Sequence, residues 1–266
     1  MHDPATPVTS GWQLALVTGV CALLAAATAD AWPEQCKFAA ERALTLDTKG
    51  IEKLEIVGRG GDLKVRTGSA TTISASGRAC ASSAALLERT QIRSSREGGN
   101  ARVFVQIPDE PGDLDDGGYA TLDLAVQVPA GLGIEITDTS GDVDAQGIKL
   151  ARITDSSGDI EVRDSSGDLE VSDSSGDLSF TAIDGALTVS DSSGDLQVDT
   201  ARSVRVVRDS SGDLRIVRVS GDVTIENDSS GDIVVDDVGG NVEVVTDSSG
   251  ERRIEHVKGT IREPEE

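Results

Sequence analysis

Large aromatic side chains are scarce in this sequence. Only 2% of its 266 residues are aromatic, with two Trp, one Tyr and three Phe, whereas Gly reaches 29. A core built on large rings is therefore excluded, and any core must consist of Val, Ile, Leu and Ala in thin layers. A chain of this length can still bury a sizeable core without a metal or a framework of several disulfides.

Histidine and basic side chains are also few. The histidines are His2, in the N-terminal leader, and His256, so the sequence offers no His-based catalytic triad and no three-His metal site. Asp and Glu total 47 against 24 Lys and Arg, which gives a formal net charge of −23. This charge repels nucleic acid, which we exclude as a partner, and favours cations or basic partners.

The one long apolar run lies at the N-terminus. Residues 12–27 have the length of a signal-peptide core, and the following AAATADA offers cleavage sites after Ala27, Ala29 and Ala31. We interpret residues 1–31 as a signal peptide and predict export to the periplasm or cell surface of a bacterium. The segment before the run contains no Lys or Arg, so an uncleaved anchor is the alternative. No second apolar span of about 20 residues follows, so the mature chain is not expected to cross a membrane.

Two cysteines remain after the leader is removed, Cys36 and Cys80. In an exported protein the simplest arrangement is one disulfide between them, and two buried free thiols are the alternative. Closing a loop of this size contributes about 3 to 4.5 kcal/mol in the chain-entropy model. We predict the disulfide.

A five-residue motif recurs through the C-terminal half. DSSGD begins at residues 155, 164, 173, 191, 209 and 228, with DTSGD at 138 and DSSGE at 247. Turn glycines recur every nine or ten residues, but the full motif settles to every 18 or 19, so each unit has two unlike corners. Strands with alternating apolar residues, such as Leu196 and Val198, follow the corners.

Identical turns at a fixed spacing indicate parallel strands that stack in register. We predict an all-β protein whose residues 131–262 form a parallel β-solenoid, a two-sheet right-handed roll of about seven coils with 18–19 residues per coil. A three-sided left-handed helix would show a period of six residues, whereas the period here is nine. An antiparallel sandwich is the alternative. Arg252 occupies a slot that holds inward Leu or Ile in earlier coils, and is expected to end the stack.

The flanking regions lack the strict repeat. Residues 32–130 contain strand-like runs such as 54–57 and 101–107, and are expected to form an irregular β-rich region that caps the first coil. Ser83 is expected to cap a short covering helix. Residues 263–266 form an acidic tail.

The whole pattern resembles the bacterial β-strand-repeat family named putative adhesins. The resemblance rests on the leader, the strand-rich segment, the run LAVQVPAGLGIEITDTSGDVDA at 124–145 and the serial SGD turns. It implies an exported envelope or surface protein, and it carries no catalytic residues to transfer.

A non-catalytic binding module is the function that these features favour. Carboxylates that cleave carbohydrate are singled out by unusual surroundings, whereas these Asp residues recur in every coil. A solenoid presents repeated side chains at fixed spacing, which suits an envelope polymer or protein partner. A passive envelope scaffold is the alternative, and the oligomeric state is left open.

Two lines of Asp residues are candidate calcium ligands. Carboxylates about 5 Å apart repel by about 0.8 kcal/mol in bulk water, and a divalent cation between coils would relieve this repulsion with the oxygen ligands it prefers. The alternative is that Asp, Ser and Gly serve the turn alone. No other cofactor is expected. The candidate ligands are Asp155, Asp173, Asp191, Asp209 and Asp228 on one line, and Asp159, Asp177, Asp195, Asp213 and Asp232 on the other.

Overall fold

The computed structural model describes residues 36–108 and 118–264, which belong to one compact unit spanning Cys36–Glu266. The predicted signal peptide lies outside the described residues, as do the last two residues of the predicted acidic tail. The described residues form twenty strands and the six-residue helix α1 (Ala84–Arg89), which Ser83 caps by accepting a hydrogen bond from the Leu86 N–H at 3.2 Å.

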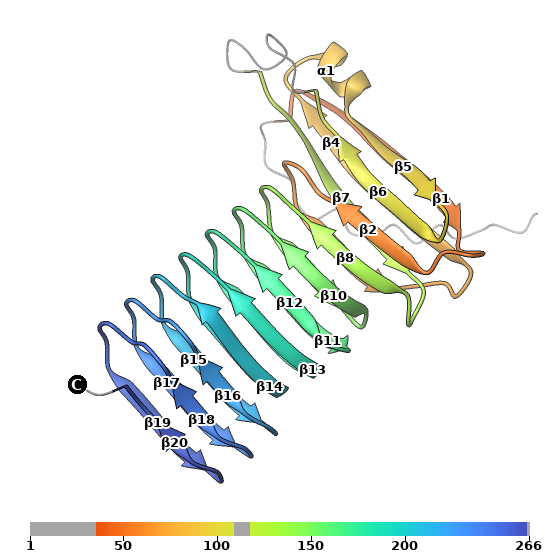
Figure 1. The fold of residues 1–266 in the computed structure, drawn as a ribbon. Coiled ribbons are helices and arrows are strands. Elements are labelled where there is room, and N and C mark those ends of the chain that lie inside the picture. Colours follow the sequence, from red (N-terminus) through yellow and green to blue (C-terminus); the bar gives the residue numbers. More distant parts are fainter. Residues whose placement is uncertain (1–35, 109–117, 265–266) are drawn as a thin grey trace, which may run out of the picture. The chain divides into compact units, whose positions relative to one another are not determined.

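The strands pair in two series, here called sheet A and sheet B (Figure 1). In spatial order, sheet A runs through β5 (Gln91–Glu97), β6 (Asn100–Gln106), β2 (Lys53–Val57), β8 (Gly133–Thr137), β10 (Lys149–Thr154), β12 (Leu169–Ser172), β13 (Leu178–Ser190), β14 (Leu196–Arg208), β16 (Val223–Ile225), β18 (Val242–Val244) and β20 (Ile261–Arg262). Sheet B runs through β1 (Phe38–Asp47), β4 (Thr72–Ala81), β7 (Ala120–Val128), β3 (Leu63–Thr67), β9 (Val143–Gln146), β11 (Ile160–Ser166), then β13 and β14 again, β15 (Leu214–Val219), β17 (Ile233–Val238) and β19 (Arg252–Val257). The long strands β13 and β14 contribute to both sheets.

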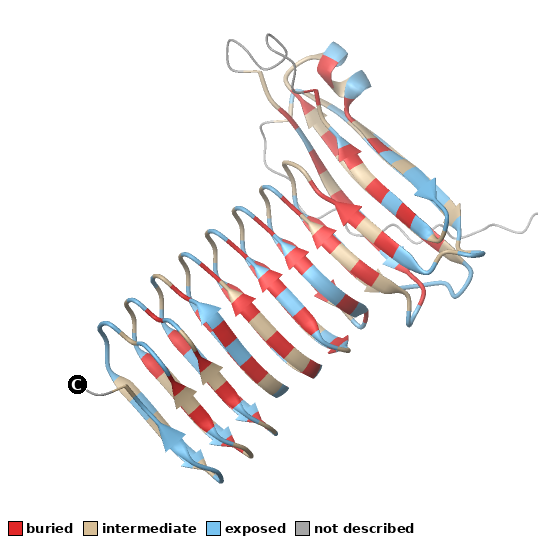
Figure 2. Cartoon of the chain, viewed as in Figure 1, coloured by how far each residue is buried: buried red, intermediate tan, exposed pale blue. Residues whose placement is uncertain are grey.

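The pairing register confirms the parallel β-solenoid. Leu196 of β14 lies opposite Leu178 of β13 on one side and Leu214 of β15 on the other, a shift of one repeat in each direction. Leu178, Leu196 and Leu214 are each 1% exposed. Along the strands, buried residues alternate with more exposed ones, as the coloured bands in Figure 2 show. The core is therefore a continuous stack of Leu, Ile and Val between the two sheets.

The N-terminal region extends this stack. Strands β2 and β3 pair in parallel with β8 and β9 on one side and with β6 and β7 on the other. The spatial order of these coils is therefore β6 and β7, then β2 and β3, then β8 and β9, which differs from their order along the chain. Antiparallel pairing begins only beyond them, where β5 joins β6 and where β4 and β1 follow β7.

A disulfide joins Cys36 to Cys80, the pair that the sequence predicts, with the two Cα atoms 5.6 Å apart. Cys80 lies in β4, whose partner β1 starts two residues after Cys36. The bond therefore links Cys36, just before β1, to β4, which lies between β1 and β7.

Reduction of this disulfide should lower stability. It closes a loop of 44 residues, which contributes about 4 kcal/mol in the chain-entropy model. We expect the melting temperature to fall by roughly 8–16 °C in a reducing buffer, measured by calorimetry, and a Cys36→Ser, Cys80→Ser variant to melt at the same temperature with or without reductant. Two free thiols in mass spectra of protein isolated without reductant would contradict the prediction.

Replacement of an inward leucine tests the register directly. Leu196 is 1% exposed, so Leu196→Asp buries an unpaired carboxylate and should destabilise the fold by about 3 kcal/mol or more. The adjacent Gln197 is exposed, and Gln197→Asp adds the same charge on the outer face with little effect. Equal melting temperatures for the two variants would show that the inward assignment of β14 is wrong.

Candidate functional site

Most DSSGD segments form corners that connect sheet A to sheet B, and their residues stack from coil to coil. The copy at 164–168 lies instead at the opposite corner, between β11 and β12. In the corner at 191–195, the Ser193 hydroxyl donates to the Ser174 carbonyl at 3.1 Å. Gly194 has a φ of +134°, and a Cβ there would lie 1.9 Å from the carbonyl oxygen of Gly176. Only glycine satisfies both the backbone conformation and this close approach. The corner sequence is therefore set by the contact between neighbouring coils.

The second Asp of each motif at these corners forms the outer Asp column, and its side chains are exposed. Each carboxylate accepts a hydrogen bond from the backbone N–H of the equivalent residue one coil further: Asp177 donates to Asp159, and Asp195 to Asp177, both at 2.9 Å. The chain of bonds starts at Asp123, which accepts from Asp62, and ends where Glu251 donates to Asp232. One oxygen of each outer carboxylate thus belongs to the turn. The column comprises Asp142, Asp159, Asp177, Asp195, Asp213 and Asp232.

The first Asp of each motif at the corners from sheet A to sheet B forms the inner Asp column, and its side chains are buried. The exposed fraction is at most 4%, reached by Asp173, and falls to 0% at Asp228. At Asp138, Asp155, Asp173 and Asp228 no hydrogen bond of ordinary length and angle reaches either carboxylate oxygen, although backbone N–H groups of the same corner lie nearby. Asp191 uses one oxygen to accept from the Ser192 and Ser193 N–H groups, and Asp209 uses one to accept from the Ser211 N–H. The column comprises Asp138, Asp155, Asp173, Asp191, Asp209 and Asp228. The structure therefore separates the two predicted lines into a buried one and an exposed one.

Burial raises the pKa of every inner carboxyl. It raises the pKa of Asp138 and Asp209 to about 7 and that of Asp173 and Asp228 to about 6, from an ordinary value of 3.8. The pKa values of Asp155 and Asp191 are also raised, again by burial. Negative charge on neighbouring column members adds to this, and nearby Ser N–H groups act in the opposite direction.

The inner column has different ends. At its C-terminal end, Arg252 occupies the register position of Ile233, as the sequence predicts, and its guanidinium pairs with Asp247 at 2.7 Å. The Asp247 side chain is 1% exposed. At the other end, Gly58 takes the Asp slot of the coil before Asp138, and a Cβ there would lie 2.4 Å from the Asp138 Oδ1 atom. The missing side chain at Gly58 therefore makes room for the Asp138 carboxylate. At the C-terminal end, the Arg252 guanidinium pairs with Asp247, which follows Asp228 in the next coil.

The opposite corner holds a group that sequence reasoning missed. Asp236, Glu255 and His256 place potential metal-ligand atoms within 4.8 Å of one another, the one such group of three found in the described residues. However, His256 Nδ1 lies 2.6 Å from Asp236, and Arg253 holds both oxygens of Glu255 at 3.0 Å. Asp236 and His256 are therefore paired with each other and Glu255 is paired with Arg253, and the group lies largely in solvent.

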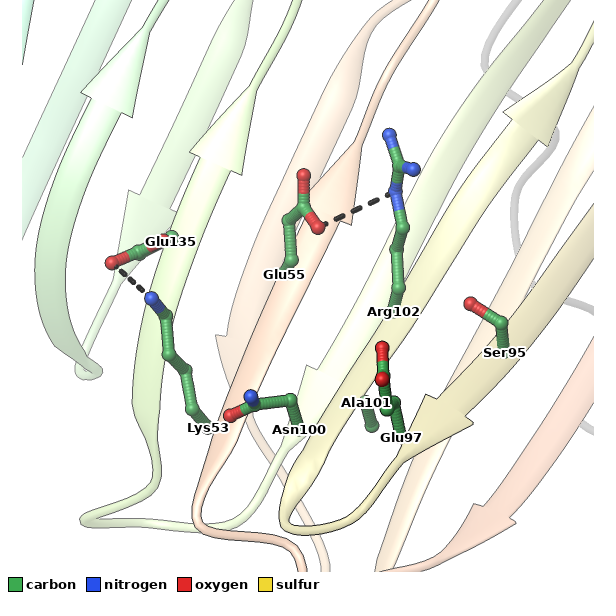
Figure 3. Close-up of a pocket in the computed structure, with 8 residues that line it drawn as sticks. All are labelled: Lys53, Glu55, Ser95, Glu97, Asn100, Ala101, Arg102 and Glu135. Atoms are coloured by element: carbon green, nitrogen blue, oxygen red, sulfur yellow. Dashed lines mark ion pairs between the residues drawn. The ribbon is translucent and has the colours of Figure 1, made fainter.

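A shallow hollow of about 360 Å³ lies over sheet A at β5, β6, β2 and β8 (Figure 3). Two ion pairs cross the hollow, since Lys53 meets Glu135 at 2.5 Å and Arg102 meets Glu55 at 3.4 Å. Ser95 and Glu97 of β5 line the same hollow. No signal in the sequence pointed to it, because it depends on the spatial order of β6, β2 and β8.

Comparison with known proteins places the chain. A family model described as Toastrack DUF4097 matches residues 41–207. The chain belongs to this family. Among curated proteins none matches. The Toastrack chain is similar to a structure described as a putative adhesin from Bacteroides fragilis, with 12% identity, coverage of 85% of this chain and 97% of the other, and a TM-score of 0.45.

Two further solved structures are similar to this Toastrack chain. One is described as a putative lipid binding protein from Parabacteroides distasonis, with 15% identity, coverage of 81% and 96%, and a TM-score of 0.44. The other is described as a putative cell adhesion protein from Clostridium sporogenes, with 12% identity, coverage of 85% and 100%, and a TM-score of 0.37. Across residues 36–108 and 118–264, no helix has the length and hydropathy to cross a membrane.

The inner column predicts how stability depends on pH when no divalent cation is present. The folded pKa values, up to about 7, exceed the ordinary 3.8, so the folded Toastrack chain holds more protons than the unfolded chain between these limits. The contribution of these carboxyls to the free energy of unfolding therefore falls as pH rises from about 4 to 7. With a chelator present, we expect a higher melting temperature at pH 5 than at pH 8.

Matched variants separate this effect from general charge repulsion. Asp173→Asn removes one buried titrating group and should flatten the pH dependence, whereas Asp177→Asn changes an exposed carboxylate that makes a turn hydrogen bond. A melting temperature that rises between pH 5 and pH 8, or an equal response of the two variants, would contradict the prediction.

Proposed function

We propose that this protein is an exported, non-catalytic binding protein of the bacterial envelope, and that the DSSGD corner is its contact surface for a polymer or protein partner. One observation carries the proposal: the corner presents the same exposed carboxylate in every coil, at positions fixed by backbone hydrogen bonds. The apolar leader supports export.

The spacing of the outer column favours a repetitive partner. Adjacent coils lie about 4.8 Å apart, so a ligand with evenly spaced groups can meet several carboxylates at once, and weak contacts then add through avidity. Each outer side chain is held by the N–H of the next coil, for example Asp213 to Asp195 at 2.9 Å. Little side-chain freedom is therefore lost on binding.

The charge of the chain indicates the chemistry of the partner. The formal net charge of −23 and the line of exposed carboxylates attract basic groups and repel anionic polymers. A cationic polymer, or a protein with a basic stripe, fits this surface. A passive scaffold is the competing function, and it requires no partner at the corner.

A pull-down with envelope fractions tests the proposal. The immobilised full chain is incubated with polysaccharide and protein fractions, and saturation is measured against salt. A triple variant, Asp177→Asn, Asp195→Asn and Asp213→Asn, keeps an oxygen to accept each backbone hydrogen bond but removes the charge. We expect saturable binding to the natural chain and at least a roughly tenfold weaker affinity for the triple variant.

The matched control removes the same charge from sheet A, through Glu170→Gln, Glu226→Gln and Glu243→Gln. These three side chains pair with Arg152, Arg205 and Arg262 on the outer face of that sheet. The control should bind as the natural chain does. Equal loss in both variants would reject the corner as the surface, and no saturable binding at all would favour the passive scaffold.

A further inference from the structure

The turn explains only part of the inner Asp column. Ser193, Gly194 and Asp195 each make a contact that stacks neighbouring coils. One oxygen of Asp191 accepts from the Ser192 and Ser193 N–H groups within the corner, but its other oxygen is buried without a partner. At Asp155 and Asp173 neither oxygen accepts a hydrogen bond of ordinary geometry. Buried carboxylates without partners are costly, so something must compensate them.

The end of the column shows what it accepts. At Asp247 the chain itself supplies a cation, because Arg252 turns into the position of an inward apolar residue and pairs with a carboxylate that is 1% exposed. Within residues 36–108 and 118–264, no Lys or Arg forms an ion pair with any of the six column members from Asp138 to Asp228. Those six have the same buried carboxylate without the internal cation.

We propose that the inner Asp column, from Asp138 to Asp228, binds calcium ions between adjacent coils. This proposal does not depend on the binding function proposed above. Its ligands are the unpartnered oxygens of successive carboxylates, one from each coil, directed into the stack rather than into solvent.

The coil spacing fits this ion. Equivalent atoms of adjacent parallel strands lie about 4.8 Å apart, so an ion midway between two stacked oxygens lies about 2.4 Å from each. That distance falls within the 2.3–2.6 Å range of Ca²⁺ and exceeds the 2.0–2.1 Å that Mg²⁺ requires. Two carboxylates using both oxygens supply four ligands, and water or corner peptide carbonyls would fill the other positions.

Charge balance sets the number of ions. Each calcium neutralises two carboxylates, so the six members of the column balance at most three ions. Ions in adjacent gaps would repel strongly, and occupation of alternate gaps avoids this. The outer column is a weaker site, because it is solvated and one oxygen of each carboxylate already accepts a backbone N–H.

The test counts calcium ions on the full chain. Protein stripped with chelator and desalted at pH 7.5 is titrated with CaCl₂, and bound ions are counted by native mass spectrometry and by calorimetry. We expect one to three ions per chain and a melting temperature raised by at least about 5 °C at millimolar calcium, relative to NaCl of equal ionic strength. This count on the natural chain tests the proposal even if a column variant fails to fold.

Paired variants locate the ions. Asp173→Asn with Asp191→Asn neutralises two inner neighbours and should remove at least one ion, whereas Asp177→Asn with Asp195→Asn neutralises two outer neighbours and should remove none. Loss of calcium only in the outer pair would overturn the proposal, as would the absence of stoichiometric uptake. Identical melting curves in calcium and in NaCl, together with a higher melting temperature at acidic pH, would also overturn the proposal. That result would show that protons, not calcium, neutralise the buried carboxylates.

Discussion

The distance between hydrogen-bonded parallel coils controls what every corner can contain. At Gly194 the neighbouring backbone comes so close that a Cβ would lie 1.9 Å from a carbonyl oxygen, so the corner accepts only glycine. The same distance lets the Ser193 hydroxyl reach the Ser174 carbonyl and lets the Asp195 N–H reach the Asp177 carboxylate. The repeated motif is thus the chemical consequence of one spacing applied at every coil.

That spacing also explains how far the sequence could predict the fold. The interval of 18 or 19 residues required equivalent positions to stack, and Leu178, Leu196 and Leu214 do stack in register. The N-terminal coils could not be ordered in this way, because residues 32–130 lack a repeat, and β2 and β3 lie between coils formed by later strands. A weak signal was present: GRGGD at 58–62 is a degenerate copy of the motif, with Gly58 in the Asp slot.

The candidate site was predicted in part, since both Asp lines were recognised but treated as equivalent. The period of two in the strands distinguishes them, because Leu187, Val189 and Asp191 share one parity and face inward, whereas Asp195 has the opposite parity to the inward Leu196. The Asp236, Glu255 and His256 group could not be predicted, because its members come from adjacent coils that bear no motif at that corner.

The two Asp residues of one motif lie in different environments, the outer one in solvent and the inner one in the core, and they therefore have different physical consequences. The outer carboxylates are exposed to solvent and are held in line by the backbone, which suits an electrostatic contact surface. The inner carboxylates lie one above another in a buried stack, where their charge opposes folding unless a proton or a cation is present. An amide at Asp173 could stack without this penalty, so the carboxylate makes the stability of the solenoid depend on the pH and ions around it. This dependence extends over six successive coils rather than one site, because the coils from Asp138 to Asp228 carry the same buried group.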